Sequence, residues 1–233
     1  MSLLIDNIGF LLDRPGEQQG SLDKLGLAVT VDEMVKGAKA PTIQDLLLLS
    51  NHFGLSADLM LKRDLKQMSK AAEQEIKLLI LDVDGVMTDG GMFVADAGDE
   101  FKRFNVKDGV AIRRLTKKGF QVGIISSGYL VNLIMQRADL LGIQRVHVGQ
   151  EPKLDTLKAW SEELDIPLQN TAFIGDDLND KAVMEAVGLS VCPADACDEI
   201  KEIADLIMTR NGGMGCIREF LDHYLANNPM AGG

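Results

Sequence analysis

Apolar positions between residues 77 and 225 fall into short runs that alternate with longer amphipathic stretches. The short runs predict strands at 77–81, 121–125, 146–148, 171–174, 189–192 and 206–208. The amphipathic stretches predict helices at 110–118, 130–141, 154–164, 181–186, 196–204 and 216–225. Residues 92–94 and 100–105 flank a turn-rich segment, 95–99, and predict a β-hairpin. Because strands that alternate with helices form βαβ units, the pattern predicts an α/β fold with a parallel sheet and helices on both faces.

The N-terminal part of the chain shows a different pattern. Residues 1–66 predict a small all-α domain, with the strongest helix at 44–53 and a turn at 54–58. Residues 67–76 are mostly polar and predict a linker or an exposed helix end. The α/β domain is therefore expected to cover residues 77–233.

Composition and charge narrow the functional classes. The 233 residues are 46% hydrophobic and 25% charged, which is typical of a soluble globular protein. The net charge of −11 argues against general binding to nucleic acid or to an anionic membrane. No apolar run approaches the roughly 20 residues that span a bilayer, and the N-terminus lacks the pattern of a signal peptide. The three cysteines fit neither a disulfide scaffold nor a zinc site, so a cytoplasmic protein is expected.

Two aspartates end the first predicted strand of the α/β domain. Asp82 and Asp84 follow the apolar run 77–81 and are separated by one residue. Because side chains alternate along a strand, both carboxylates are expected on one face, where they repel each other. A bound cation or a shared proton would offset that repulsion, so the pair indicates a reaction centre. A simple turn or helix cap is the alternative.

Other polar groups follow neighbouring strands of the predicted sheet. Asp176 comes just after one strand, and Asp180 lies four residues later, on the same face if a helix begins there. Ser126 directly follows another strand. Ligands of open parallel sheets bind beyond the carboxyl ends of the strands, so these groups should converge there. Carboxylate oxygens suit Mg²⁺, a serine hydroxyl can hold a phosphoryl oxygen, and Lys153 can supply a fixed positive charge.

The order of these motifs resembles a known superfamily. The segments are Asp82-Val83-Asp84-Gly85-Val86, a serine after the second strand, a lysine, and Gly175-Asp176-Asp177-Leu178-Asn179-Asp180. They are similar to the four ordered motifs of the haloacid dehalogenase superfamily of phosphohydrolases. The resemblance covers about residues 76–225 and implies a Rossmann-like sheet.

Further segments carry a closer resemblance. They are Thr88-Asp89-Gly90-Gly91, Phe101-Lys102-Arg103-Phe104, Lys107-Asp108-Gly109 and residues 211–219. They are similar to the capless 3-deoxy-D-manno-octulosonate 8-phosphate phosphatase family. The resemblance implies a small β-hairpin flap instead of a separate cap domain, and a Gly-rich tail that folds over the site. It also implies a homotetramer in which neighbouring subunits help to close the site.

The resemblance implies a role for each acidic motif residue. Asp82 is expected to attack phosphorus and form an aspartyl-phosphate, and Asp84 to act as general acid and base. Mg²⁺ is expected on Asp82, the backbone carbonyl of Asp84, and Asp176. Asp177 or Asp180 is expected at the metal site, where it orients a metal-bound water or the motif lysine. A plain helix cap is the alternative for Asp180.

The phosphoryl group is expected on Ser126 and Lys153. Ser127 is the alternative to Ser126, because the local sequence is one residue longer than the usual form of the motif, and Lys153 could instead be a solvated surface lysine. The further candidates for substrate binding are Ser127, Gly128, Arg137 and Arg218, with a surface salt bridge as the alternative for Arg137. The resemblance thus implies a Mg²⁺-dependent phosphomonoesterase acting on a small phosphorylated sugar acid. We expect 3-deoxy-D-manno-octulosonate 8-phosphate, from lipopolysaccharide biosynthesis, or else a nine-carbon sugar acid 9-phosphate.

The N-terminal domain resembles a phage-repressor-type helix-turn-helix in segments 21–27, 41–46 and 52–56. Where a recognition helix would lie, residues 29–34 carry Asp32 and Glu33 and no basic side chain. Specific DNA binding needs basic and polar donors there. We therefore interpret the domain as a degenerate module for packing, oligomerisation or protein contacts. A DNA-binding regulator with a phosphatase-like sensor domain is the alternative.

Overall fold

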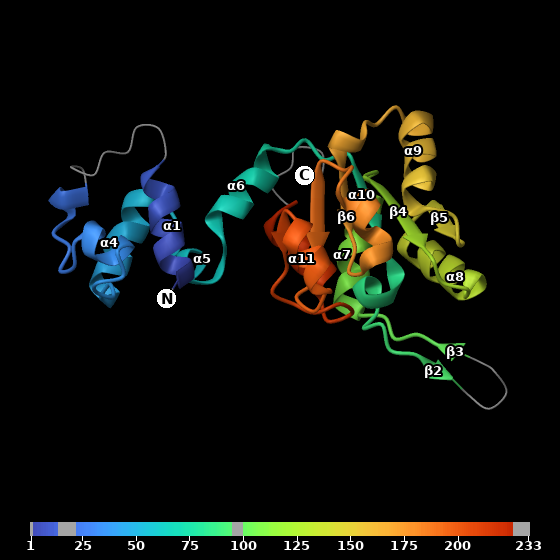
Figure 1. The fold of residues 1–233 in the computed structure, drawn as a ribbon, viewed down its shortest axis with the longest axis horizontal. Coiled ribbons are helices and arrows are strands. Elements are labelled where there is room, and N and C mark those ends of the chain that lie inside the picture. Colours follow the sequence, from blue (N-terminus) through green and yellow to red (C-terminus); the bar gives the residue numbers. More distant parts are fainter. Residues whose placement is uncertain (1, 14–21, 95–99, 226–233) are drawn as a thin grey trace. The chain divides into compact units, whose positions relative to one another are not determined.

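The structure is a computed structural model that describes residues 2–13, 22–94 and 100–225 (Figure 1). The chain divides into two compact units, residues 1–70 and 71–233. The division falls within helix α6 (Leu65–Glu73), so most of the predicted linker is helical. The predicted domain limits at residues 66 and 77 stay predictions.

A six-stranded parallel sheet forms the centre of the described part of the second unit (Figure 1). Its strands are β1 (Leu78–Leu81), β4 (Gln121–Ser126), β5 (Arg145–Val148), β6 (Thr171–Ile174), β7 (Leu189–Cys192) and β8 (Leu206–Ile207). Their order across the sheet is β5-β4-β1-β6-β7-β8, and each neighbouring pair is parallel. This confirms the predicted α/β fold.

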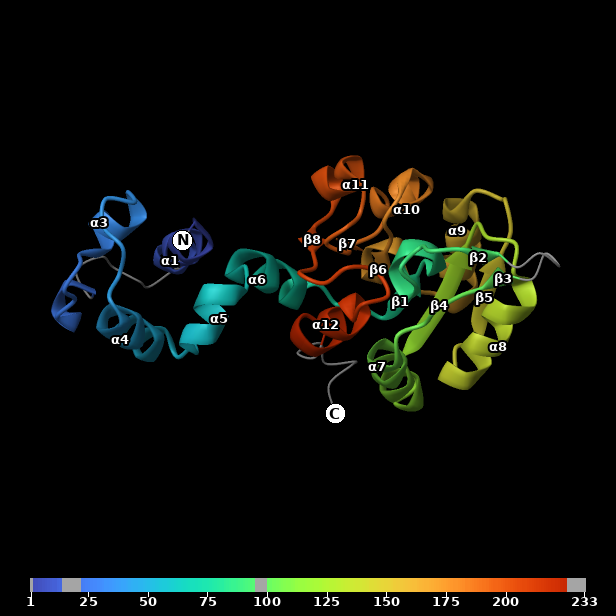
Figure 2. The same cartoon turned by 90° about the horizontal axis from the view of Figure 1, so that it is seen from below.

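Helices cover both faces of this sheet (Figure 2). On one face lie α7 (Val106–Lys117), α8 (Val131–Leu141) and α12 (Cys216–His223), and on the other α9 (Lys153–Leu164), α10 (Lys181–Met184) and α11 (Asp198–Ile203). The central strand β1 is fully buried, which is why it reads as a continuous apolar run. No helix in the described residues is long and apolar enough to cross a membrane.

The predicted hairpin is present as β2 (Phe93–Val94) and β3 (Glu100–Phe101), which pair antiparallel and project away from the sheet (Figure 1). Its predicted turn, residues 95–99, lies outside the described residues. The second strand ends at Phe101, short of the predicted 100–105, and Asn105 instead caps α7. The Asn105 side chain accepts from the backbone N–H of Lys107 at 2.8 Å. Helix α7 therefore begins four residues before the predicted start at Val110.

The first unit is helical, as predicted. Its elements are α1 (Ser2–Leu12), η1 (Asp23–Leu25), α3 (Val31–Val35), α4 (Ile43–Phe53), α5 (Ala57–Lys62) and the start of α6. Capping boxes begin two of these helices, at Thr30 for α3 and at Thr42 for α4. The buried Asn7 side chain donates to the carbonyls of Met60 and Arg63, which fixes α1 against α5.

Candidate active site

Asp82 lies at the carboxyl end of β1, where the chain leaves the sheet. Its backbone N–H donates to the last carbonyl of β6 at 3.0 Å, and its side chain is buried. The chain continues as a turn, η2 (Val83–Met87), which carries Asp84 and has non-helical backbone angles at Asp84 and Gly85. Gly85 in this turn has φ = 84°, and a Cβ there would lie 2.0 Å from Asp176 Oδ2. Glycine is therefore required for both the conformation and the close approach of the two acidic loops.

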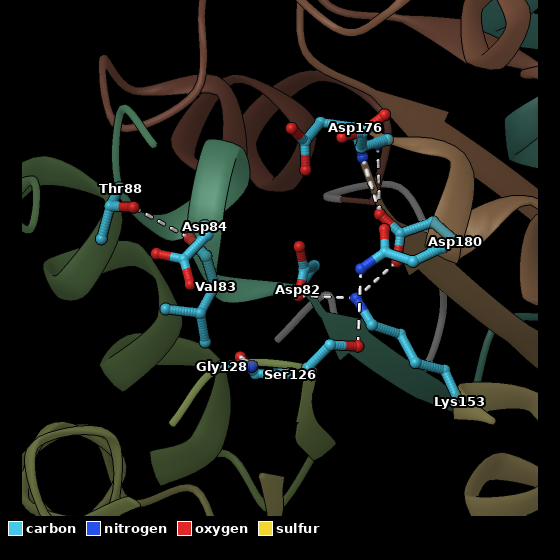
Figure 3. Close-up of polar contacts among 12 residues, drawn as sticks. Asp82, Val83, Asp84, Thr88, Ser126, Gly128, Lys153, Asp176 and Asp180 are labelled. Carbon is cyan, nitrogen blue, oxygen red and sulfur yellow. Dashed lines mark hydrogen bonds and ion pairs between the residues drawn. The ribbon is translucent and has the colours of Figure 1, made fainter. Parts of the chain in front are cut away.

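A cavity of about 330 Å³ opens beside Asp82. It is lined by Asp82, Asp84, Gly85, Gly90, Ser126, Ser127, Gly128, Asp176, Asp177 and Asn179. These residues lie at or beyond the carboxyl ends of β1, β4 and β6. The structure thus brings polar groups from several strand ends to one edge of the sheet, as the sequence pattern indicated (Figure 3).

A buried lysine joins two of the carboxylates (Figure 3). The Nζ of Lys153, the first residue of α9, lies 2.8 Å from Asp82 Oδ1 and 2.6 Å from Asp180 Oδ1. All three side chains are buried. Burial acts to lower the pKa of Lys153, but the two carboxylates outweigh burial and raise this pKa. The side chain is therefore an ammonium. A solvated surface position for Lys153 is thereby excluded.

Asp180 is committed to structure through both of its carboxylate oxygens. Oδ1 accepts from Lys153, and Oδ2 accepts from the backbone N–H of Asp176 at 2.9 Å and of Asp177 at 3.4 Å. Asp180 closes a single 3₁₀ turn, η4 (Leu178–Asp180), in a reciprocal capping box with Asp177. It therefore fixes the turn that presents Asp176 and holds the ammonium in place.

Asp176 has a carboxyl oxygen that the described chain leaves without a partner. Its Oδ1 is buried and has no hydrogen-bond partner among the described residues. Burial, followed by the charges of Asp82 and Asp180, raises the pKa of Asp176 to about 8. Burial and the charge of Asp180 also raise the pKa of Asp82. These are the effects expected of like charges brought together out of water.

The donor set fits a divalent cation. Asp82, Asp176 and Asp180 each place an oxygen so that the three lie within 4.8 Å of one another. Because Asp180 is engaged with Lys153 and the backbone, Asp82 and Asp176 are the side chains with oxygens left to offer. Three carboxylates face one ammonium, so a bound cation would relieve the repulsion that raises the pKa of Asp176. Hard oxygen donors of this kind suit Mg²⁺.

Asp84 lines the cavity and is partly exposed, and it lies on the other side of Asp82 from Asp180 and Lys153 (Figure 3). Its Oδ1 accepts from Lys102, a residue just after β3 whose side chain is only 4% exposed. The neighbouring Arg103 pairs with Asp89. The sequence placed Lys102 on the hairpin but gave no signal for this contact, since the two partners are 18 residues apart and on different elements.

Both serine candidates line the cavity. Ser126 is buried, and its Oγ accepts from the backbone N–H of Gly128 at 3.1 Å. Ser127 is partly exposed, and its Oγ accepts from Asn179 Nδ2 at 3.4 Å. Asn179 is a lining residue that the sequence placed in a motif without a role of its own. The choice between the two serines stays a prediction.

The other candidates lie in different surroundings. Asp177 lines the cavity, but its Oδ1 accepts from the backbone N–H of Leu178 at 2.8 Å. Arg137 and Arg218 are not among the residues that line the cavity. The guanidinium of Arg137 stacks on the ring of Phe104, 5.0 Å from its centroid. Arg218 pairs with Asp222 one turn along α12. Within one chain, packing therefore holds both arginines away from Asp82.

The glycine-rich segment at the start of residues 211–219 packs directly on the turn that carries Asp84. The backbone N–H of Gly213 donates to the carbonyl of Val86 at 2.9 Å. A Cβ at Gly212 would lie 1.7 Å from the carbonyl oxygen of Gly85, so only glycine fits there. The segment therefore braces η2 from the side of α12. Residues 226–233, which belong to the predicted tail, lie outside the described residues.

Known proteins are similar to this chain in sequence and in fold. A family model of haloacid dehalogenase-like hydrolases matches residues 145–220. The 3-deoxy-D-manno-octulosonate 8-phosphate phosphatase of Escherichia coli is 43% identical over 158 residues, which cover 68% of this chain and 82% of the relative.

Solved structures of phosphatases with the same name are similar to this chain in fold. The phosphatase of the same name from Yersinia pestis is 39% identical, covers 70% of this chain and 87% of its own, and superposes with a TM-score of 0.66. The Moraxella catarrhalis enzyme of that name was crystallised with a magnesium ion, a phosphate ion and a KDO molecule. It is 33% identical, covers 70% of this chain and 91% of its own, and has a TM-score of 0.65.

Proposed function

This chain belongs to the 3-deoxy-D-manno-octulosonate 8-phosphate phosphatase family of haloacid dehalogenase-like hydrolases, and from that premise we propose that it hydrolyses this sugar acid phosphate with Mg²⁺ as cofactor. One observation carries the proposal. At one edge of the sheet, Lys153 holds the buried Asp82 carboxylate beside Asp176, whose Oδ1 has no partner in the described chain. That is the donor set of a metal-assisted phosphoryl transfer.

In the proposed mechanism a carboxylate oxygen of Asp82 attacks phosphorus, and the bond from phosphorus to the sugar oxygen breaks. Asp84, protonated at this stage, gives its proton to that oxygen, so the sugar acid leaves as an alcohol. Water then attacks the phosphorus of the aspartyl-phosphate and gives a proton to Asp84. The bond from phosphorus to Asp82 breaks, phosphate leaves, and both side chains return to their starting states.

Asp82, Asp176 and the backbone carbonyl of Asp84 would hold the cation. Bound Mg²⁺ would neutralise the facing carboxylates and stabilise the negative charge of the phosphoryl oxygens. Asp180 acts through Lys153 and the turn, and Asp177 through the capping box with Asp180. The magnesium and phosphate ions in the Moraxella catarrhalis relative support this assignment.

Lys153 and a serine would bind the phosphoryl group. The ammonium already lies 2.8 Å from the proposed nucleophile, so it can contact a phosphoryl oxygen while it orients Asp82. Ser126, Ser127 and the backbone N–H of Gly128 border the same cavity and offer neutral donors. The KDO molecule bound to the Moraxella catarrhalis relative supports an eight-carbon sugar acid as the leaving group.

We also propose that the enzyme is a homotetramer. In support, α7 and α8 expose Val106, Val110 and Leu140, which line a shallow cavity of about 260 Å³ together with Arg137. Adjoining apolar side chains of this kind on a surface indicate a protein contact. Sedimentation analysis of the full chain is expected to show four copies per particle, and a monomer at micromolar concentration would contradict the proposal.

A substrate panel tests the function. We would measure phosphate release with Mg²⁺ from 3-deoxy-D-manno-octulosonate 8-phosphate, from a nine-carbon sugar acid 9-phosphate and from 4-nitrophenyl phosphate. The eight-carbon substrate is expected to give the highest kcat/KM. Asp82→Asn, with its circular dichroism unchanged, is expected to lose at least about 1,000-fold in activity. A preference for the nine-carbon substrate would reassign the substrate, and activity retained in Asp82→Asn would remove the nucleophile.

A further inference from the structure

A lysine from the hairpin reaches the proposed acid and base. The Lys102 ammonium donates to Asp84 Oδ1, and its side chain is 4% exposed whereas that of Asp84 is 41% exposed. Burying an ammonium is costly unless it is paired, so breaking this contact would carry a large free-energy cost. Nothing in the mechanism above requires Lys102, because it does not line the cavity.

The contact occupies one carboxylate oxygen and leaves the other toward the substrate. A Cβ at Gly128 would lie 3.4 Å from Asp84 Oδ2 and 3.2 Å from Ser126 Oγ. Asp84 Oδ2 is therefore directed to the side of the cavity where the phosphoryl-binding groups lie. Without the contact to Lys102, the partly exposed Asp84 side chain would sample several rotamers in solvent.

The neighbouring residue provides an internal comparison. Arg103 pairs with Asp89, which lies on the same loop as Asp84 but does not line the cavity. The Arg103 side chain is 59% exposed. Two consecutive hairpin residues thus contact the same loop, one through the proposed acid and one through a carboxylate outside the cavity.

We propose that Lys102 is a positioning residue that holds the Asp84 carboxyl group in line with the leaving oxygen, so that the hairpin acts in proton transfer. The inference rests on the proposed function, and it adds a residue outside the four motifs to the reaction. Lys102 does not line the cavity in which the phosphoryl group would bind. Its effect is confined to the steps in which Asp84 gives or takes a proton.

The leaving group separates this role from a structural one. A sugar alkoxide is a poor leaving group and needs the proton from Asp84, whereas 4-nitrophenolate leaves without it. The ratio kcat/KM reports events up to formation of the aspartyl-phosphate, so it isolates the acid step from the later attack of water. A misplaced Asp84 therefore lowers kcat/KM for alkyl phosphates and spares it for aryl phosphates.

The experiment compares Lys102→Met with Arg103→Met, using the sugar acid phosphate and 4-nitrophenyl phosphate. Lys102→Met is expected to lower kcat/KM about 100-fold for the sugar acid phosphate and less than about 3-fold for the aryl phosphate. Arg103→Met is expected to affect the two substrates equally. In an Asp84→Asn background, Lys102→Met should cause no further loss, because both changes remove the same proton transfer.

Equal losses on both substrates in Lys102→Met, or additive losses with Asp84→Asn, would overturn the proposal and leave the proposed function intact. A crystal structure of Lys102→Met tests the position of Asp84 without any measurement of activity. The Asp84 carboxylate is expected to turn away from Gly128 while Asp82 and Lys153 keep their contact. An unmoved Asp84 would also overturn the proposal. An inactive wild-type enzyme with a displaced Asp84 in this variant would contradict the proposed function, and with it the role in proton transfer, but not the positioning of Asp84 by Lys102.

Discussion

The Nζ of Lys153 lies 2.8 Å from Oδ1 of Asp82, and both side chains are buried. The lysine begins a helix on one face of the sheet, and the aspartate directly follows the central strand β1. The contact therefore joins two layers of the fold at the site of the proposed chemistry. Its loss should affect both stability and turnover, and the two effects can be measured separately.

Lys153→Met should destabilise the metal-free protein. The change removes the ammonium between Asp82 and Asp180 and leaves their buried carboxylates unpaired, which costs on the order of 3 kcal/mol. Chemical denaturation in the presence of a chelator measures the free energy of unfolding. Lys158→Met, at an exposed position of the same helix, is the control and should change it by less than about 0.5 kcal/mol. Equal stability of the two variants would contradict the buried ion pair.

The stability of the metal-free protein should fall as pH rises. The pKa of Asp176 is raised from 3.8 to about 8, so the folded state holds its proton more tightly than the unfolded state. This contribution is fully present below pH 3.8 and is lost as pH rises toward 8. Melting temperatures in a chelator are expected to fall across that window in the wild type and to fall less in Asp176→Asn.

Added Mg²⁺ should reverse that trend. Because the cation needs the ionised carboxylate, the rise in melting temperature that it causes should grow as pH approaches 8, the pKa of Asp176. Asp176→Asn should lose most of this rise. A Mg²⁺ effect that is independent of pH, or that is the same in Asp176→Asn, would place the cation elsewhere.

Much of this site could be predicted from the sequence because sheet geometry is regular. Side chains at the carboxyl ends of parallel strands meet at one edge, so Asp82, Ser126 and Asp176 could be placed together from the order of the strands. Lys102 could not be placed, because the path of a hairpin after a short strand depends on contacts that no local pattern specifies. The start of α7 was placed too late for a related reason. Gly109 weakens the helical pattern, whereas the Asn105 cap outweighs it.

The N-terminal unit should not bind DNA specifically. In α3, Asp32 pairs with Lys36 at 2.8 Å and Glu33 with Lys39 at 2.7 Å, so the nearby lysines are neutralised by acids. Phosphate contacts need uncompensated positive charge. Gel-shift titration of the full chain at physiological salt is expected to show no binding tighter than about 10⁻⁶ M, the range of non-specific complexes. A sequence-specific footprint below that concentration would favour the regulator hypothesis.

Gly212→Ala should disable the enzyme from outside the cavity. A Cβ at this position would lie 1.7 Å from the carbonyl oxygen of Gly85, so either the glycine-rich segment or the turn that carries Asp84 must move. A shift of about 1 Å in a catalytic group can cost about 100-fold in rate. We therefore expect kcat to fall by about that factor, together with a lower melting temperature.

Gly9→Ala, within α1, is the matched control, because nothing lies within 4 Å of a Cβ at that position. It should keep full activity and gain up to about 1 kcal/mol in stability. Unchanged kinetics in Gly212→Ala would show that the segment does not brace the acidic turn.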